Sequence, residues 1–405
     1  MLAFSVVAII IVIGFLGNLL FRKTGFPDIL FLLSFGLLLG PVLQIFPRQN
    51  LLPIAPYLTL LALIMVLFNG GIEMNLYKVL SQSVRASILA TLYFILCTLG
   101  VALFASFIFN MGWIESLMLG PMIAGTSSVV IIPLASKLNL DEQTAMTLSL
   151  ESAITDVLNI VFLFALLQAY LAAFPGIQET VSSIAAKFSV GSVLGFIVGI
   201  AWLRALYIFR REEYTYMLTI AVLICCYVVS ELLGGSGVLS SLVFGLVLGN
   251  DEDIIKMLRM DIDSAVLNSM KEFLKRFQSE LSFLIKAFFF VFLGLIYEVS
   301  GLPLALALIY GIALTALDLG LRYAAVHVST IKSPMASNRV PMTLMCGQGL
   351  AHAALSVIPM QYGLPKAHIY VTIVVTVILL TNIVTSISAL MIQRRSKPSE
   401  NPGMV

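Results

Sequence analysis

The chain has 405 residues, of which 60% are hydrophobic and only 11% charged, and its mean hydropathy is +1.04. A soluble domain carries about a quarter charged residues because its surface must face water, so these charges are too few to cover a water-soluble globule of this length. The net charge of +2 gives no indication of nucleic-acid binding. The composition therefore predicts a polytopic membrane protein whose surface is solvated mainly by the lipid bilayer.

Thirteen apolar segments have roughly the length needed to cross about 30 Å of hydrocarbon. The first lacks a basic leader and a small-residue cleavage site, so we interpret it as a retained span and not as a signal peptide. The ninth is short and rich in glycine, which is why the predicted number is about 13. The predicted spans are residues 2–20, 27–46, 52–69, 84–109, 113–135, 143–172, 180–209, 215–232, 236–249, 279–297, 303–326, 340–362 and 367–392.

The Lys and Arg residues indicate the orientation of these spans, because cytoplasmic loops are enriched in both. With the N-terminus outside, 19 of the 23 basic residues, Arg322 among them, fall on the cytoplasmic side. Three fall outside, and Lys286 lies within a span. We therefore expect a multi-pass protein of the cell membrane with its N-terminus outside and its C-terminus in the cytoplasm.

Residues 251–278 form the one extended charged segment between the predicted spans. Their apolar residues recur at helical spacing, which predicts an amphipathic helix on the cytoplasmic face. A linker between two halves of a helical bundle is an equally good interpretation, and the two are compatible.

Two spans are interrupted in a similar way. Proline removes a backbone donor and glycine loosens a helix, so both segments are expected to unwind near mid-membrane, where irregular backbone is tolerated only beside a cavity or inside protein. Such a pair indicates a transporter's binding site, and their separation by seven spans predicts two halves of inverted topology. The interrupting residues are Pro121, Gly125, Thr126-Ser127-Ser128 and Pro133 in one span, and Pro341, Gly347-Gln348-Gly349, His352 and Pro359 in the other.

A polar stripe on the span over residues 143–172 is the strongest candidate for a binding surface. Ser149, Ser152, Asp156 and Asn159 are spaced by three, four and three residues, so they share one face of a helix. Burying an aspartate at a helix centre costs roughly 2.5–3.5 kcal/mol, which favours a functional role for Asp156. A carboxylate at this depth can bind either a dehydrated cation or a proton. Competition between the two is the minimal chemistry of an antiporter.

Other ionisable side chains inside the predicted spans are also candidates for a role. Glu151 is about 140° around the helix from Asp156, so it is expected to pair with a cation or to orient a neighbouring helix. Lys286 is interpreted either as a buried partner of Asp156 or Glu151 or as a side chain that reaches to the cytoplasmic interface. His352 is predicted to be a packing residue more readily than a proton relay, and Asp318 is left without a role.

Several motifs resemble the cation–proton antiporter superfamily, and the resemblance covers essentially the whole chain. The run Glu151-Ser152-Ala153-Ile154-Thr155-Asp156 is similar to the Glu-Ser-x-x-Asn-Asp signature of the sodium–proton exchanger branch. Glycine-containing runs at residues 24–28 and 67–73 resemble the second and third spans of that superfamily. By this resemblance, Asp156 is the ion-binding aspartate and Glu151 the structural glutamate.

The chain departs from the family pattern at three places. Thr155 replaces the signature asparagine, and Thr126-Ser127-Ser128 replaces Thr-Asp-Pro on the first broken helix. Ala351 stands where the later Gly-Leu-Arg motif has its arginine. The glutamate's usual basic partner is therefore expected to be missing, and Lys286 is the obvious substitute. These departures concern ion selectivity more than the fold.

The resemblance implies an all-α membrane protein with about 13 transmembrane helices, in which two inverted-topology repeats have broken helices that cross at mid-membrane. Residues 1–405 are expected to form a single transporter unit. Its ion-binding core is predicted over about 84–172 and 303–392, and its dimerisation scaffold over about 1–69 and 180–297. The resemblance also implies a homodimer and elevator-like alternating access.

The predicted function is electroneutral monovalent cation/proton exchange in pH homeostasis, with Na⁺ as the expected cation. K⁺/H⁺ antiport by the same architecture is the closest alternative, and sodium-coupled symport of an organic anion is a more distant one. An enzyme is not expected, because the three histidines lack metal-ligand spacing, and no cofactor is predicted. The expected cation site, for Na⁺ or K⁺, is centred on Asp156, with supporting charge from Glu151 and Lys286; its other members are Thr126, Ser127, Ser152 and Thr155.

Overall fold

The computed structural model describes residues 2–74, 84–138, 140–171, 177–209, 212, 214–257, 264–297 and 302–396, and within these ranges it contains helices and turns but no strand. Ten helical stretches are long and apolar enough to cross a membrane, and three shorter apolar helices lie between them. Each of the thirteen predicted segments has a helical counterpart. The expectation of an all-α, multi-pass membrane protein is confirmed.

The long helices contain few interruptions, because their interiors are made mostly of aliphatic and aromatic residues. They are α1 (Leu2–Thr24), α4 (Ala55–Glu73), α6 (Val84–Ile108), α9 (Glu142–Leu171), α10 (Ile177–Ile208), α11 (Thr215–Leu232), α14 (Ser264–Leu295), α15 (Leu304–Ser329) and α18 (Ala367–Ser396).

Shorter elements complete the bundle, and two pairs of them are the halves of interrupted spans. The pairs are α7 (Trp113–Ile123) with α8 (Ser128–Lys137), and α16 (Arg339–Leu344) with α17 (Leu350–Gln361). The remaining elements are α2 (Asp28–Leu37) continued by η1 (Leu38–Val42), α3 (Arg48–Leu51) and η2 (Leu52–Ile54) before α4, α12 (Gly237–Gly249), α13 (Asp251–Met257), and η3 (Pro334–Asn338) before α16.

The charged segment over residues 251–278 forms two helical pieces among the described residues. The first is α13, and the second is the first half of α14. Helix α14 then continues without a break into the tenth apolar span and ends at Leu295. The side chains of residues 256–277 lie outside the described part of the chain, so the amphipathic face remains a prediction.

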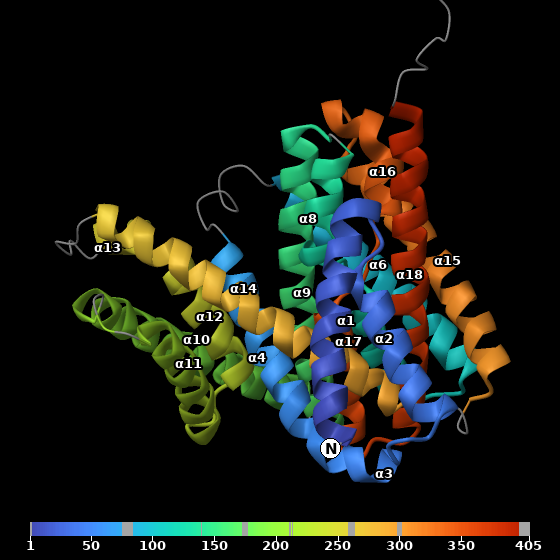
Figure 1. The fold of residues 1–405 in the computed structure, drawn as a ribbon, viewed down its shortest axis with the longest axis horizontal. Coiled ribbons are helices and arrows are strands. Elements are labelled where there is room, and N and C mark those ends of the chain that lie inside the picture. The colour runs from blue at the N-terminus through green and yellow to red at the C-terminus, as the bar shows by residue number, and fades with distance from the viewer. Residues whose placement is uncertain are drawn as a thin grey trace, which may run out of the picture.

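The helices are arranged around a central group (Figure 1). Helices α10, α11 and α12 lie on one side, α15 lies at the opposite edge, and α14 runs from the first side towards the centre. Helix α6 packs against α7, α9 and α15, and α17 packs against α18, α7 and α4. The interrupted helices are therefore enclosed by other helices.

Small residues allow one pair of these helices to approach very closely. At Gly71 of α4, an added Cβ would lie 2.3 Å from the carbonyl oxygen of Leu242 on α12, and at Gly245 it would lie 2.4 Å from the carbonyl oxygen of Phe68. Close backbone contact of this kind is typical of helix packing in membranes, where dispersion forces hold helices together. The α4–α12 contact therefore fixes the position of α4, which lies beside the site described below.

Candidate ion-binding site

The two interrupted helices meet inside the bundle, as expected. The Ser127 amide, in the break between α7 and α8, donates to the Gly347 carbonyl in the break between α16 and α17, at 2.8 Å. Gly125 adopts a φ of +112°, and a Cβ added there would lie 2.9 Å from Nδ2 of Asn159. The first break thus depends on a backbone conformation that other residues rarely adopt.

Polar side chains satisfy the backbone of the first break. Asn159 Nδ2 donates to the Ala124 carbonyl, and Ser152 Oγ donates to the Thr126 carbonyl at 2.8 Å. His352 Nε2 lies 3.1 Å from the same Ala124 oxygen, so Nε2 must carry the proton because a carbonyl can only accept. His352 therefore joins the two broken helices, and its role as a packing residue stays a prediction.

The second break is held in the same way. The Gln348 side chain donates from Nε2 to the Ile123 backbone carbonyl at 2.5 Å. The backbone carbonyl of Gln348 accepts from Asn382 Nδ2 at 2.9 Å. The Cys346 amide donates to Thr385 Oγ1 at 3.2 Å. Unwound backbone is stable at membrane depth only with such partners. The second break is therefore held by hydrogen bonds to α7 and α18.

Asp156 projects from α9 towards a cavity of about 500 Å³ beside this crossing. Its Oδ1 atom is buried and accepts no hydrogen bond from the described residues. The cavity is lined by α1, α2, α4, α8, α9, α14 and α17, and it reaches the exposed residues Arg22 and Glu73 at the ends of α1 and α4. A carboxylate that lines an open cavity and has an oxygen without a protein donor is suited to bind a cation or a proton.

The structure divides the five predicted ion-binding residues into two groups. Ser127 and Asp156 line the cavity. Thr126, Ser152 and Thr155 are fully buried beneath it, and their hydroxyl groups donate within the protein. Thr155 donates to the carbonyls of its own helix. The structure thus places Ser127 and Asp156 on the cavity wall, Thr126 and Ser152 in contacts that hold the first break, and Thr155 in contacts within α9.

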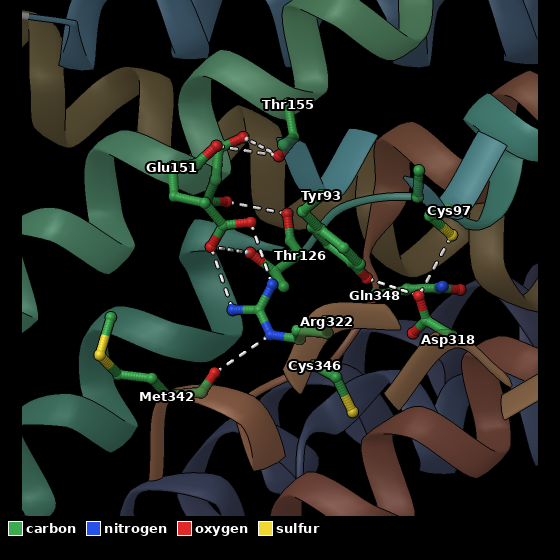
Figure 2. A network of polar contacts seen from close by, with 12 residues as sticks. Tyr93, Cys97, Thr126, Glu151, Thr155, Asp318, Arg322, Met342, Cys346 and Gln348 are labelled. Carbon is green, nitrogen blue, oxygen red and sulfur yellow. Dashed lines mark hydrogen bonds and ion pairs between the residues drawn. The ribbon is translucent and has the colours of Figure 1, made fainter. Parts of the chain in front are cut away.

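Glu151 points away from the cavity and pairs with Arg322 of α15 (Figure 2). The two side chains are completely buried and bind bidentately, with Nη1–Oε1 and Nη2–Oε2 distances of 3.1 Å. Thr126 Oγ1 donates to Glu151 Oε2 at 3.3 Å, and Arg322 Nε donates to the Met342 carbonyl at 3.1 Å. The pair therefore connects the first break to α16, next to the second break.

This pairing corrects the prediction that the basic partner of Glu151 is missing. Arg322 is that partner, so Lys286 is not its substitute. Lys286 instead binds Asp28 of α2, with Nζ and Oδ2 2.5 Å apart, and it lies on the cavity wall. It is neither the buried partner of Asp156 or Glu151 nor free to reach the membrane interface.

Sequence reasoning missed Arg322 because it counted that residue with the cytoplasmic loops. The structure places it inside α15, fully buried. Asp318 and Arg322 are four residues apart and share one helix face, so their spacing was the available signal of a polar surface within that span. Asp318 itself accepts from Tyr93 Oη at 2.6 Å and from Cys97 Sγ at 3.3 Å (Figure 2).

Comparison with known proteins bears on this geometry. A family model described as sodium/hydrogen exchanger, transmembrane, matches residues 7–393. The chain belongs to the sodium/hydrogen exchanger family. This membership confirms the resemblance drawn from the motif around Glu151 and Asp156.

Family members with similar sequences carry two kinds of name. A probable Na⁺/H⁺ antiporter 2 from Methanocaldococcus jannaschii is 27% identical over 288 residues, which are 67% of this chain and 64% of that protein. A K⁺/H⁺ antiporter NhaP2 from Shewanella sp. (strain ANA-3) is 27% identical over 391 residues, or 93% of this chain and 63% of the relative. The chain thus spans less than two thirds of the length of these relatives.

A solved structure shows the same fold. The sodium proton antiporter MjNhaP1 from Methanocaldococcus jannaschii matches with a TM-score of 0.81 over 98% of each chain, at 22% sequence identity. The similarity of the two folds extends over nearly the whole chain, including both interrupted spans.

Proposed function

We propose that this family member is a monovalent cation/proton antiporter of the cell membrane, in which the cation and the proton compete for Asp156. The observation that carries this proposal is the Asp156 carboxylate, which lines the cavity beside the crossed helices and whose buried Oδ1 has no donor among the described residues. A carboxylate that binds either ligand, but not both, couples the movement of one to the return of the other. Ser127 would supply an additional oxygen to the cation.

Na⁺ is the first candidate for the cation, and the family to which the chain belongs supports it. K⁺ is the second candidate, because relatives that match 93% or more of this chain are named K⁺/H⁺ antiporters. Symport of an organic anion is disfavoured, since among the described residues that line the cavity Lys286 is already bound to Asp28 and Arg22 lies at the exposed end of α1, away from a buried anion site. Both cation candidates use the same oxygen ligands, so the ion must be identified by experiment.

For the transport movement, we propose a core of about residues 84–172 and 303–392 that carries Asp156 and moves against a scaffold of about 1–69 and 180–297. The site is built from both parts, because α8, α9 and α17 meet α1, α2, α4 and α14 around the cavity. Movement of the core would separate Asp156 from the Lys286–Asp28 side of the cavity. A homodimer joined through the scaffold, with the N-terminus outside, completes the proposal.

The test is proton flux in proteoliposomes after addition of Na⁺, K⁺ or Li⁺ in turn, with wild-type protein and the Asp156→Asn variant. An amide cannot take up a proton from water at neutral pH, so the variant should give the flux of protein-free vesicles. The cation that drives flux in the wild type is the substrate.

Glu142→Gln is the matched control, because Glu142 is an exposed carboxylate at the start of the same helix. It should retain wild-type flux. Wild-type rates in Asp156→Asn would exclude Asp156 as the exchange site, and the absence of flux with all three cations would exclude monovalent cation antiport.

A further inference from the structure

Asp318 is a second buried carboxyl group, and the proposed exchange at Asp156 makes no use of it. It lies on α15, is completely buried, and is separated from the cavity wall. Its Oδ1 accepts two hydrogen bonds, from Tyr93 Oη and Cys97 Sγ on α6, while its Oδ2 is buried without a partner among the described residues. The two oxygens of this carboxyl group are therefore in very different surroundings.

Glu151 provides an internal comparison within the same cluster. Both of its oxygens accept from Arg322, and one accepts from Thr126 as well, which is the pattern of an ionised carboxylate. Asp318 has no such pattern. An ionised carboxylate spreads its charge over both oxygens, and leaving one of them buried without a donor is costly. A neutral carboxyl group with its proton on Oδ2 avoids that charge and leaves Oδ1 free to accept, at the smaller cost of one hydroxyl group without an acceptor among the described residues.

The charges around Asp318 lead to the same result. Within the described residues, the ionisable groups in electrostatic range of Asp318 are Tyr93, Cys97, Cys346, Arg322 and Glu151. The single guanidinium is already bound bidentately by Glu151 and lies 4.9 Å above the Tyr93 ring. An ionised Asp318 would therefore be an uncompensated charge in the membrane interior, at a cost that buried ion pairs exist to avoid.

We propose that Asp318 is a second proton-binding site, neutral while Arg322 is paired with Glu151. Loss of its proton would create two carboxylates that compete for one guanidinium. Arg322 is one helical turn from Asp318 and holds the Glu151–Thr126 contact at the first break, so a shift of the guanidinium towards Asp318 would weaken that contact. Asp318 would thereby link proton binding in α15 to the geometry of the broken helix.

The test is infrared spectroscopy of the protein reconstituted in lipid, in which a protonated carboxyl group has a C=O stretch distinct from the bands of carboxylates and amides. Asp156→Asn serves as the parent, so that Asp156 contributes nothing to the spectrum. The protonated-carboxyl absorption should decrease by one group when Asp318→Asn is added. An unchanged absorption would overturn the proposal.

Tyr93→Phe provides a second variant that leaves Asp318 in place. It removes the 2.6 Å hydrogen bond to Oδ1, so the same C=O stretch should move to higher frequency. A band that does not move would show that the absorbing group is not Asp318.

Thermal denaturation separates the two carboxyl groups of the cluster. Asn has the shape and neutrality of a protonated aspartic acid, so Asp318→Asn should change the Tm far less than Glu151→Gln, which leaves Arg322 unpaired. An equal loss of Tm would mean that Asp318 is ionised. None of these measurements requires transport, so they hold or fail separately from the proposed exchange at Asp156.

Discussion

At the scale of single residues, the buried pair of Glu151 and Arg322 has no contact with the cavity, yet it sets the position of the first broken helix through Thr126. Ion pairs in a low-dielectric interior are costly to form and more costly to break by removing one partner. The value of this pair lies in specifying one arrangement of α9, α15 and the break.

Glu151→Gln should lower the free energy of unfolding by about 3–5 kcal/mol, because it leaves the Arg322 charge buried without a counter-ion. The Tm in detergent, followed by the loss of monodisperse protein on heating, measures this effect. The double variant Glu151→Leu/Arg322→Met removes both charges and should be more stable than Glu151→Gln. A double variant less stable than the single one would show that the charge itself is not the cause.

Lys286→Gln should destabilise the protein less, by about 1–3 kcal/mol, since Asp28 loses its partner but lies on the wall of a cavity that water can enter. The measurement is again the Tm. Adding Asp28→Asn should restore most of the loss, because the uncompensated carboxylate is then gone. An unaltered Tm in Lys286→Gln would show that the pair contributes nothing to stability.

The sequence was informative about single residues where periodicity was sufficient. The spacing of Ser152, Asp156 and Asn159 placed them on one face, and the structure puts all three near the first break. It was uninformative where the partner lies far away in the chain. Glu151 and Arg322 are 171 residues apart, and only the packing of α9 near α15 brings them together.

At the scale of elements, the two breaks were predictable because proline and glycine interrupt apolar runs for physical reasons that are local. How the breaks are held was not predictable, because the side chains that bind their backbone carbonyls come from α9, α17 and α18, which are distant in the chain. Glycine at the first break has a requirement of its own, since both its φ and its surroundings exclude a side chain.

Gly125→Ala should disrupt exchange, because a Cβ would lie within 3.2 Å of side chains from α9 and α17, in a conformation that costs about 1–3 kcal/mol. Gly234→Ala is the control, since Gly234 also has a positive φ, of +75°, but has nothing within 4 Å of an added Cβ. Proton flux in proteoliposomes should fall in the first variant and persist in the second. Equal flux in both would mean that the shape of the break does not govern exchange.

At the scale of the whole molecule, the membrane character and the two interrupted spans followed from composition and pattern, and the crossing of those spans followed from the family resemblance. The division into a core and a scaffold remains a prediction.

Stoichiometry belongs to the scale of the whole molecule as well. The proposed site exchanges one proton for one monovalent cation at Asp156. The Lys286–Asp28 ion pair on the cavity wall is neutral as a pair and adds no charge to this exchange.

Exchange should therefore be electroneutral. Each net charge that crosses the membrane would couple to the potential at about 2.3 kcal/mol per 100 mV, an effect large enough to detect. The measurement is cation-driven proton flux in vesicles whose potential is set with valinomycin and K⁺, with Na⁺ or Li⁺ as the driving cation. A rate or end point that follows the imposed voltage would exclude one-for-one exchange and would mean that a second group, Asp318 or Lys286, carries a proton.

The cavity beside Asp156 reaches the protein surface at the ends of α1 and α4, which lie on one side of the bundle. An ion that enters there has a single compartment as both source and destination. In protein held in this conformation, bound ions would exchange with free ions of that compartment, which an isotope of the ion would reveal. No ion would be delivered to the opposite side of the membrane. Under the proposed alternating access, net transport therefore requires a second conformation in which Asp156 is open to the opposite side of the membrane.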